Sequence, residues 1–242
     1  MSETREGIVL RSVPYGENRL IVNIFTADRG TFGLIATISK KGKAGLKKAH
    51  FQNLQILEFS HAEKSKGELK RLEEARIHYS YQNLFFDPIR SCLSLFLAEL
   101  LYKVLKEEEP QAELYAFVKD SLIQLDQAEG SFANFHLAFL MELSAFLGLF
   151  PDLSQSDQKP YFDLLEGQSC LKPPQHSYYL MPEETLLWQE IQVQGMRNWQ
   201  DIKLNKSSHR RQVLQSLVDY FRLHLNDFGE VRSLSILREV MA

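Results

Sequence analysis

The period of the hydrophobic pattern changes once along this chain, at about residue 80. Before that point, short β-branched segments alternate apolar and polar residues, a period of two that is typical of β-strands. After it, apolar residues recur every three or four positions, as in amphipathic helices. Strands and helices in separate blocks predict an α+β protein with two domains, residues 1–80 and 81–242.

The first block predicts five short strands. They are expected over Glu6–Val13, Leu20–Phe25, Thr31–Ser39, Leu54–Ala62 and Glu68–Tyr79. Turn residues separate them, most clearly Asp28-Arg29-Gly30, where glycine can adopt a positive φ. Five short strands bury little as an open sheet, so closure into a small barrel is expected. An oligonucleotide-binding (OB) barrel is the best-known five-stranded solution, and an SH3-like barrel is the alternative.

The second block predicts an all-helical domain. Asp87 as N-cap and Pro88 at the first helical position begin a long helix that ends at Glu107–Glu109. Further helices are expected over Ala112–Gln127, Ser131–Phe150, Glu183–Gln194, Ser207–Asn226 and Ser233–Val240. The segment 151–182, rich in Pro, Ser, Gln and Tyr, is expected to be an irregular insertion.

Enzymatic motifs and targeting signals are not evident in this sequence. It contains no phosphate-binding loop, no dinucleotide fingerprint, no His-Glu-x-x-His and no nucleophile elbow. Glu107–Glu109 is expected to be a solvated turn, and His136 a hydrogen-bonded core or interface residue. We therefore expect no catalytic residues and no enzyme. No apolar stretch is long enough to span a membrane, and two cysteines favour a reducing cytoplasm.

Charge is distributed unevenly between the two blocks. Residues 1–80 carry 14 Lys and Arg against 9 Asp and Glu, whereas residues 81–242 carry 14 against 22. The densest basic segment, Lys40–Lys48, contains five lysines between the third and fourth expected strands. Such a segment suits a polyanion, although it also suits a solvated loop. The candidate DNA-binding residues are Arg11, Arg19, Arg29, Lys40, Lys41, Lys43, Lys47, Lys48, Lys70 and Arg71.

Aromatic residues of the first block are candidate stacking platforms for bases, which small barrels combine with a basic groove. They are Tyr15, Phe25, Phe32, Phe51 and Phe59. Several of these rings must instead fill the core of so small a barrel.

A second basic cluster, near the start of a C-terminal helix, is a candidate partner-binding site. It consists of Lys203, Lys206, Arg210 and Arg211. Cations at a helix N-terminus are electrostatically misplaced unless an anion compensates them. That anion could come from this domain's own acidic surface, from an acidic partner peptide or from nucleic acid.

Several ordered blocks resemble the DNA repair protein RecO family. Tyr15–Leu20 followed by Phe25–Gly30 is similar to its first hairpin. Further similar blocks are Ala98–Leu101, Phe146–Leu153, Tyr161–Asp163 with Gly167, and Phe228–Ser233. Together they cover nearly the whole chain in the family's order.

The resemblance implies an N-terminal OB domain, a helical C-terminal domain and a mediator of recombinational repair. Such a protein would bind single- and double-stranded DNA, anneal complementary strands and act with RecR to load RecA onto DNA coated by single-strand-binding protein (SSB). It also implies binding of the acidic SSB tail by the helical domain, and a cytoplasmic, nucleoid-associated location. The alternative is a protein-interaction adaptor in which the helical domain dominates and DNA binding is incidental.

The chain departs from the family at a four-cysteine zinc module. Ser154–Pro160 contains no cysteine, and only Cys170 lies beyond Gly167. Structural zinc needs four ligands, which one thiol and nearby His176 do not supply. We therefore expect no zinc and no other cofactor. The loop is expected to be held by packing of Tyr161, Phe162, Tyr178 and Tyr179.

Overall fold

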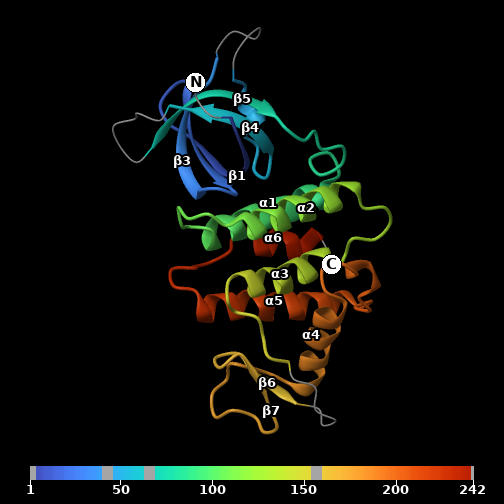
Figure 1. Ribbon diagram of the computed structural model, residues 1–242. Coiled ribbons are helices and arrows are strands. Elements are labelled where there is room, and N and C mark those ends of the chain that lie inside the picture. The colour runs from blue at the N-terminus through green and yellow to red at the C-terminus, as the bar shows by residue number, and fades with distance from the viewer. Residues whose placement is uncertain (1–3, 40–45, 63–68, 154–159, 241–242) are drawn as a thin grey trace. The chain divides into compact units, whose positions relative to one another are not determined.

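The computed structural model describes residues 4–39, 46–62, 69–153 and 160–240 (Figure 1). Contacts divide the chain into two compact units, Met1–Gln127 and Ala128–Ala242. The change of hydrophobic period at residue 80 lies inside the first unit, so the domain limits 1–80 and 81–242 stay a prediction. No helix in the described ranges is both long and apolar enough to cross a membrane.

Five strands of the first unit close into a barrel in the order β1-β2-β3-β5-β4. They are β1 (Arg5–Pro14), β2 (Arg19–Thr26), β3 (Gly30–Thr37), β4 (Ile56–His61) and β5 (Lys70–Ile77). Only β3 and β5 pair in parallel among these strands; the other pairs are antiparallel. The predicted α+β class and its OB-type barrel are confirmed.

The barrel interior is filled by every second residue of its strands, as the period of two requires. Val22 of β2 lies opposite Leu34 of β3, and Ile24 lies opposite Phe32, all in one apolar cluster. Phe25, Phe32, Phe51 and Phe59 are all buried. Phe51 ends the short 3-10 helix η1 (Lys48–Phe51), and its carbonyl accepts a 2.8 Å hydrogen bond from Ser12 Oγ. Four of the five candidate stacking rings are therefore core residues.

Helices α1 (Pro88–Val104) and α2 (Ala112–Gln127) complete the first unit. The Asp87 carboxylate accepts from Arg90 N at 2.8 Å, which confirms the predicted N-cap. Glu6 of β1 accepts from Lys119 Nζ (2.7 Å) and Tyr115 Oη (2.8 Å) of α2. Burial raises the pKa of Glu6, but these bonds and the charges of Lys119 and His78 outweigh it, so its pKa is lowered. The barrel is thereby tied to α2.

The connection from β5 to α1 is organised by one buried carboxylate, which sequence reasoning missed. Asp126 of α2 is fully buried and accepts from the backbone N–H groups of Gln82, Asn83 and Leu84 at 2.7–3.1 Å. Tyr79 Oη also donates to it at 3.2 Å. The helical period of α2 gave no sign of this role, because the partners lie more than 40 residues away.

The Glu107–Glu109 segment was expected to be a solvated turn. Its backbone instead contacts the β2–β3 hairpin. Glu107 O accepts from Thr31 N at 2.9 Å, and Gln111 N donates to Ala27 O at 3.0 Å. Gly30 has φ +69°, and a Cβ there would collide with the backbone of Glu107 and Glu109. Glycine is needed at this position for the predicted turn and for this close approach.

The second unit combines helices with a small sheet. Its helices are α3 (Phe135–Phe146), α4 (Pro182–Gln194), α5 (Ser207–His224) and α6 (Ser233–Val240), with the 3-10 turn η2 (Trp199–Asp201). Helix α3 is shorter than the predicted 131–150, and Gly148 with φ +70° follows its end. Trp188 of α4 is fully buried, and its indole N–H donates to Ser216 Oγ of α5 at 3.0 Å.

The segment expected to be irregular contains a three-stranded sheet. Its strands β6 (Tyr161–Asp163), β7 (Gln168–Cys170) and β8 (Tyr179–Leu180) pair in the order β7-β6-β8. Strands of two or three residues are too short to show a period, so the sequence pattern could not reveal them.

Candidate nucleic-acid interface

The register of the barrel gathers three predicted DNA-binding arginines on its outer surface. Arg11 lies opposite Asn23, Arg19 opposite Thr37, and Ile35 opposite Arg71. Partners in register share a face, as do residues two apart on one strand. All three arginines therefore point outward from the β1–β2–β3 wall and the start of β5, and all three are exposed.

Half-buried aliphatic residues lie between these arginines. Val13 pairs with Ile21, and Ile21 pairs with Ile35. We call this surface the arginine face: Arg11, Val13, Arg19, Ile21, Ile35 and Arg71. The aliphatic members were not predicted as site residues. The alternation of β2 and β3 placed them outward, but only the strand register shows that they form one row between the cations.

Two of the arginines lie over tyrosine rings. The guanidinium carbon of Arg19 is 5.0 Å from the ring centroid of Tyr15, and that of Arg11 is 5.0 Å from the Tyr102 centroid. Such cation–π contacts orient a guanidinium while its N–H groups stay available to an anion. The arginine face therefore presents cations in defined positions.

The described residues that flank the predicted lysine segment lie next to this face. Lys47 and Lys48 are exposed at the start of η1, whereas Lys40, Lys41 and Lys43 lie outside the described residues. Ser39 N donates to Leu46 O at 3.1 Å across the base of the segment, and Ile38 N donates to Asn18 O at 2.7 Å. Asn18 directly precedes Arg19, so Ile38, two residues before the lysine segment, lies beside the arginine face. Lys70 is half-buried opposite Leu34.

Arg29 is placed differently from the other candidates. Its guanidinium bonds the Glu108 carboxylate at 2.9 Å and lies 4.7 Å from the Phe32 ring centroid. These contacts hold the Glu107–Glu109 segment to the hairpin, and Arg29 does not belong to the arginine face. Its contact with DNA stays a prediction.

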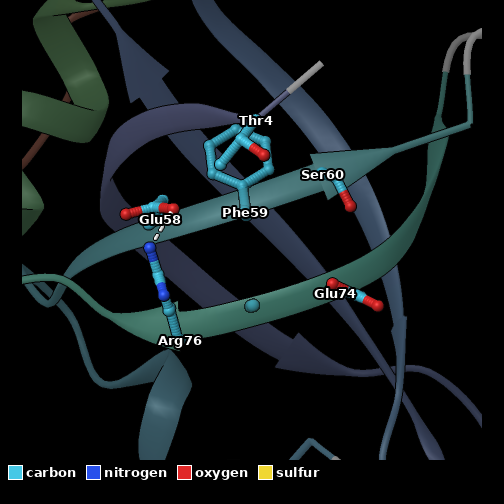
Figure 2. A pocket seen from close by; sticks show the side chains of 7 residues that line it. Thr4, Glu58, Phe59, Ser60, Glu74 and Arg76 are labelled. Atoms are coloured by element: carbon cyan, nitrogen blue, oxygen red, sulfur yellow. Dashed lines mark hydrogen bonds and ion pairs between the residues drawn. The ribbon is translucent and has the colours of Figure 1, made fainter. Parts of the chain in front are cut away.

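The wall formed by β4 and the later part of β5 carries the opposite charge. A pocket of about 320 Å³ is lined there by Thr4, Glu58, Phe59, Ser60, Glu74, Ala75 and Arg76 (Figure 2). Arg76 bonds Glu58 at 2.5 Å, which leaves Glu74 to give the pocket a negative balance. Phosphates are repelled from such a surface, so the barrel favours a polyanion on its arginine side.

The second basic cluster divides into exposed and inward-facing residues. Lys203, Lys206 and Arg211 are exposed, whereas Arg210 is half-buried and donates from Nη1 to Leu204 O at 2.7 Å. His136 of α3 is 2% exposed, and burial together with the charge of Arg210 lowers its pKa to about 3. The expectation of a core histidine is confirmed, but its Nδ1 atom has no hydrogen-bond partner in the described structure.

The small sheet holds its shape through packing and one carboxylate. Tyr161 and Tyr179 pack edge to face at 5.8 Å, and Phe162 packs against Trp188 at 5.4 Å, so packing of these three residues is confirmed. Tyr178, for which packing was also predicted, is exposed instead. The Asp163 carboxylate accepts from the N–H groups of Leu165 (2.9 Å) and Glu166 (3.2 Å). This role of Asp163 was not predicted.

The residues around Cys170 do not fit a zinc ion. Tyr178 N donates to His176 Nδ1 at 3.2 Å, so Nε2 carries the proton and donates to Asp163 at 3.2 Å. Both ring nitrogens are thus engaged by protein groups. Burial and the Asp163 charge raise the pKa of Cys170, which disfavours the thiolate that zinc needs. Nowhere in the described ranges do three His, Cys, Asp or Glu side chains cluster as metal ligands.

An OB-type barrel with a cationic outer face, followed by helices, defines a class of nucleic-acid-binding architecture. Comparison with known proteins identifies the family. Residues 1–81 match the family described as "Recombination protein O N terminal", and residues 86–233 match "Recombination protein O C terminal". The chain belongs to the RecO family of DNA repair proteins, which confirms the resemblance seen in its sequence.

Individual relatives match over 95% or more of their length. The chain is 34% identical to "DNA repair protein RecO" of Phocaeicola vulgatus, covering 100% of both chains. It is 34% identical to the protein of that name from Bacteroides fragilis, covering 99% of both. The Porphyromonas gingivalis relative, with the same name, is 34% identical over 95% of both.

Proposed function

We propose that this protein is a DNA repair and recombination mediator that binds single- and double-stranded DNA and anneals complementary strands. The observation that carries the proposal is the arginine face on an OB-type barrel in a RecO-family chain. Its cations point outward, and two of them lie over tyrosine rings, while the pocket on the β4–β5 wall has a negative balance. A strand would therefore lie along one side of the barrel.

Annealing by this route would need binding and no catalytic residue. Cations that neutralise the backbones of two strands reduce their mutual repulsion and leave the base edges free to pair. Guanidinium groups that contact phosphates position a strand without selecting its sequence. The residues proposed to contact DNA are Arg11, Arg19, Arg29, Lys40, Lys41, Lys43, Lys47, Lys48, Lys70 and Arg71.

In the wider reaction the protein would act with RecR to load RecA onto SSB-coated DNA. We propose that the exposed Lys203, Lys206 and Arg211 bind the acidic SSB tail. Arg210 belongs to the same predicted cluster, but its bond to Leu204 O indicates a mainly structural role. The proposal includes no zinc and no other cofactor. Stoichiometric zinc in a purified, tag-free sample would contradict that part of it.

Annealing of complementary labelled strands, with and without SSB, tests the proposal. We expect the protein to accelerate annealing in both conditions. The triple variant Lys203→Ala/Lys206→Ala/Arg211→Ala should anneal bare strands normally, yet fail to bind a peptide of the SSB tail. An adaptor in which DNA binding is incidental would show no acceleration on bare strands, and this result would overturn the proposal.

A further inference from the structure

Tyr15 is the one ring among the five candidate stacking residues that the structure leaves exposed. Its relative exposure is 46%, whereas Phe25, Phe32, Phe51 and Phe59 are each at most 3% exposed. An exposed aromatic ring has an apolar surface that water solvates poorly and that a base can cover. The candidates for stacking on a base therefore reduce to one.

The ring is held in place by its hairpin. Tyr15 N donates to Arg19 O at 2.8 Å, and Gly16 turns the chain with φ +73°. The Arg19 guanidinium lies 5.0 Å from the ring centroid. A ring that is already oriented loses little conformational entropy when a ligand binds to it, so more of the stacking energy contributes to affinity.

The position of the ring relates it to the phosphate-binding cations. Tyr15 directly follows the end of β1, where Pro14 pairs with Leu20, and Arg19 belongs to the arginine face. Asn18 of the same turn bonds Ile38, shortly before the lysine segment. A strand with a phosphate at the Arg19 guanidinium would pass the Tyr15 ring, because the guanidinium lies only 5.0 Å from the ring centroid.

We propose that Tyr15 stacks on an unpaired base of single-stranded DNA, and that Arg19 orients the ring while contacting the neighbouring phosphate. This inference rests on the proposed DNA-binding function and adds to it a means of favouring single strands. In a duplex the base faces are covered by their neighbours, so the ring would add nothing to duplex binding. The same holds for a sugar–phosphate strand without bases.

The test measures dissociation constants of the full chain for three labelled ligands of equal length. They are a thymidine oligonucleotide, an abasic sugar–phosphate strand and a duplex. The variant Tyr15→Leu keeps an apolar side chain without a ring, whereas Tyr15→Phe and Tyr15→Trp keep a ring. Because Tyr15 is exposed, these variants are expected to fold, and circular dichroism checks that they do.

We expect Tyr15→Leu to weaken binding of the thymidine strand by about 5- to 150-fold, the range of one base–aromatic stack. Its affinity for the abasic strand and the duplex should be unchanged, and Tyr15→Phe and Tyr15→Trp should bind the thymidine strand as the parent chain does. Unchanged thymidine binding by Tyr15→Leu would overturn the inference, as would equal weakening for all three ligands. Loss of RecR binding with DNA affinity intact would assign the ring to a protein partner instead. A parent chain that binds none of the three ligands would overturn the proposed function itself.

Discussion

The barrel and the second unit differ in which of their ionisable side chains face the solvent or the interior. The barrel carries Arg11, Arg19 and Arg71 outward and encloses an apolar cluster. The second unit also exposes cations, at Lys203, Lys206 and Arg211. Its interior, however, holds ionisable groups, Asp163 at a turn and His136 in α3. Outward cations are available to a ligand, whereas inward groups fix the fold. A basic residue in the sequence is thus a binding candidate only after its direction is known.

To separate the role of the second unit from that of the barrel, the largest effect on stability is expected from a substitution in the core of the second unit. Trp188→Ala should lower the free energy of unfolding by about 3–5 kcal/mol, because it leaves a cavity and removes the indole donor from Ser216 Oγ, which keeps only its own bond to Val213 O. Both tryptophans of the chain, Trp188 and Trp199, lie in this unit, so Trp199 fluorescence in urea still reports its unfolding. Trp188→Phe keeps an aromatic ring and should lower the free energy of unfolding by less than Trp188→Ala.

DNA affinity of the Trp188→Ala variant, measured while it is folded, should equal that of the parent chain. A large loss of affinity would mean that DNA binding depends on the second unit, and the division of roles between barrel and helices would be wrong.

The next effect concerns the connection between β5 and α1. Asp126→Ala leaves three backbone N–H groups without their acceptor, so the free energy of unfolding should fall by on the order of 3 kcal/mol. Asp126→Asn keeps one acceptor oxygen and should lower the free energy of unfolding by less than Asp126→Ala. Amide hydrogen exchange at Gln82, Asn83 and Leu84 measures the effect directly. Exchange at the parent rate in the alanine variant would show that water replaces the carboxylate at no cost.

A pH effect is expected from the buried histidine. Folding lowers the pKa of His136 from its ordinary value of 6.5 to about 3, so the unfolded chain binds the proton more tightly. Its contribution to stability is complete above pH 6.5 and is lost as pH falls toward 3, by about 1.4 kcal/mol per pH unit. Urea unfolding followed by tryptophan fluorescence between pH 7 and pH 4.5 measures this slope. His136→Gln should flatten it, and an identical slope in the variant would contradict the assignment.

The lysine segment should have the smallest effect on stability. Replacing Lys40, Lys41, Lys43, Lys47 and Lys48 by Ala should change the free energy of unfolding by less than about 0.5 kcal/mol, as for most surface substitutions. The same variant should flatten the dependence of log K on log salt for a single strand by up to about 3.5, at about 0.7 per lost phosphate contact. Lysine-to-arginine replacement at these positions keeps the charge and should keep the slope. An unchanged slope in the alanine variant would show that the segment does not contact phosphates and serves only as a solubilising surface.

Much of the fold could be predicted because hydrophobic period and capping are local properties. The bounds of α2 and α6 were predicted residue for residue, and Asp87 caps α1 as expected. Strands β6, β7 and β8 escaped prediction, since two or three residues show no period. The docking of Glu107 on Gly30 escaped it as well, because a long-range backbone contact leaves no mark in either segment.

The candidate site could be predicted in composition more than in geometry. Arg11, Arg19 and Arg71 were chosen for their charge, and the register then placed them on one face. Charge alone could not separate them from Arg29 and Arg210, whose guanidinium groups are engaged by Glu108 and Leu204. The pairing of strands determines which cations gather, and it depends on contacts across the whole barrel.

The most direct test of the arginine face is the salt dependence of single-strand binding by matched arginine variants. Arg71 and Arg76 are both exposed on β5, but Arg76 lies at the acidic pocket and pairs with Glu58. Replacing Arg11, Arg19 and Arg71 by Ala should flatten the slope of log K against log salt by about 2, at about 0.7 per phosphate contact. Arg76→Ala should leave the slope unchanged. Equal slopes for the triple variant and the parent chain, or equal flattening by Arg76→Ala and Arg71→Ala, would contradict the account.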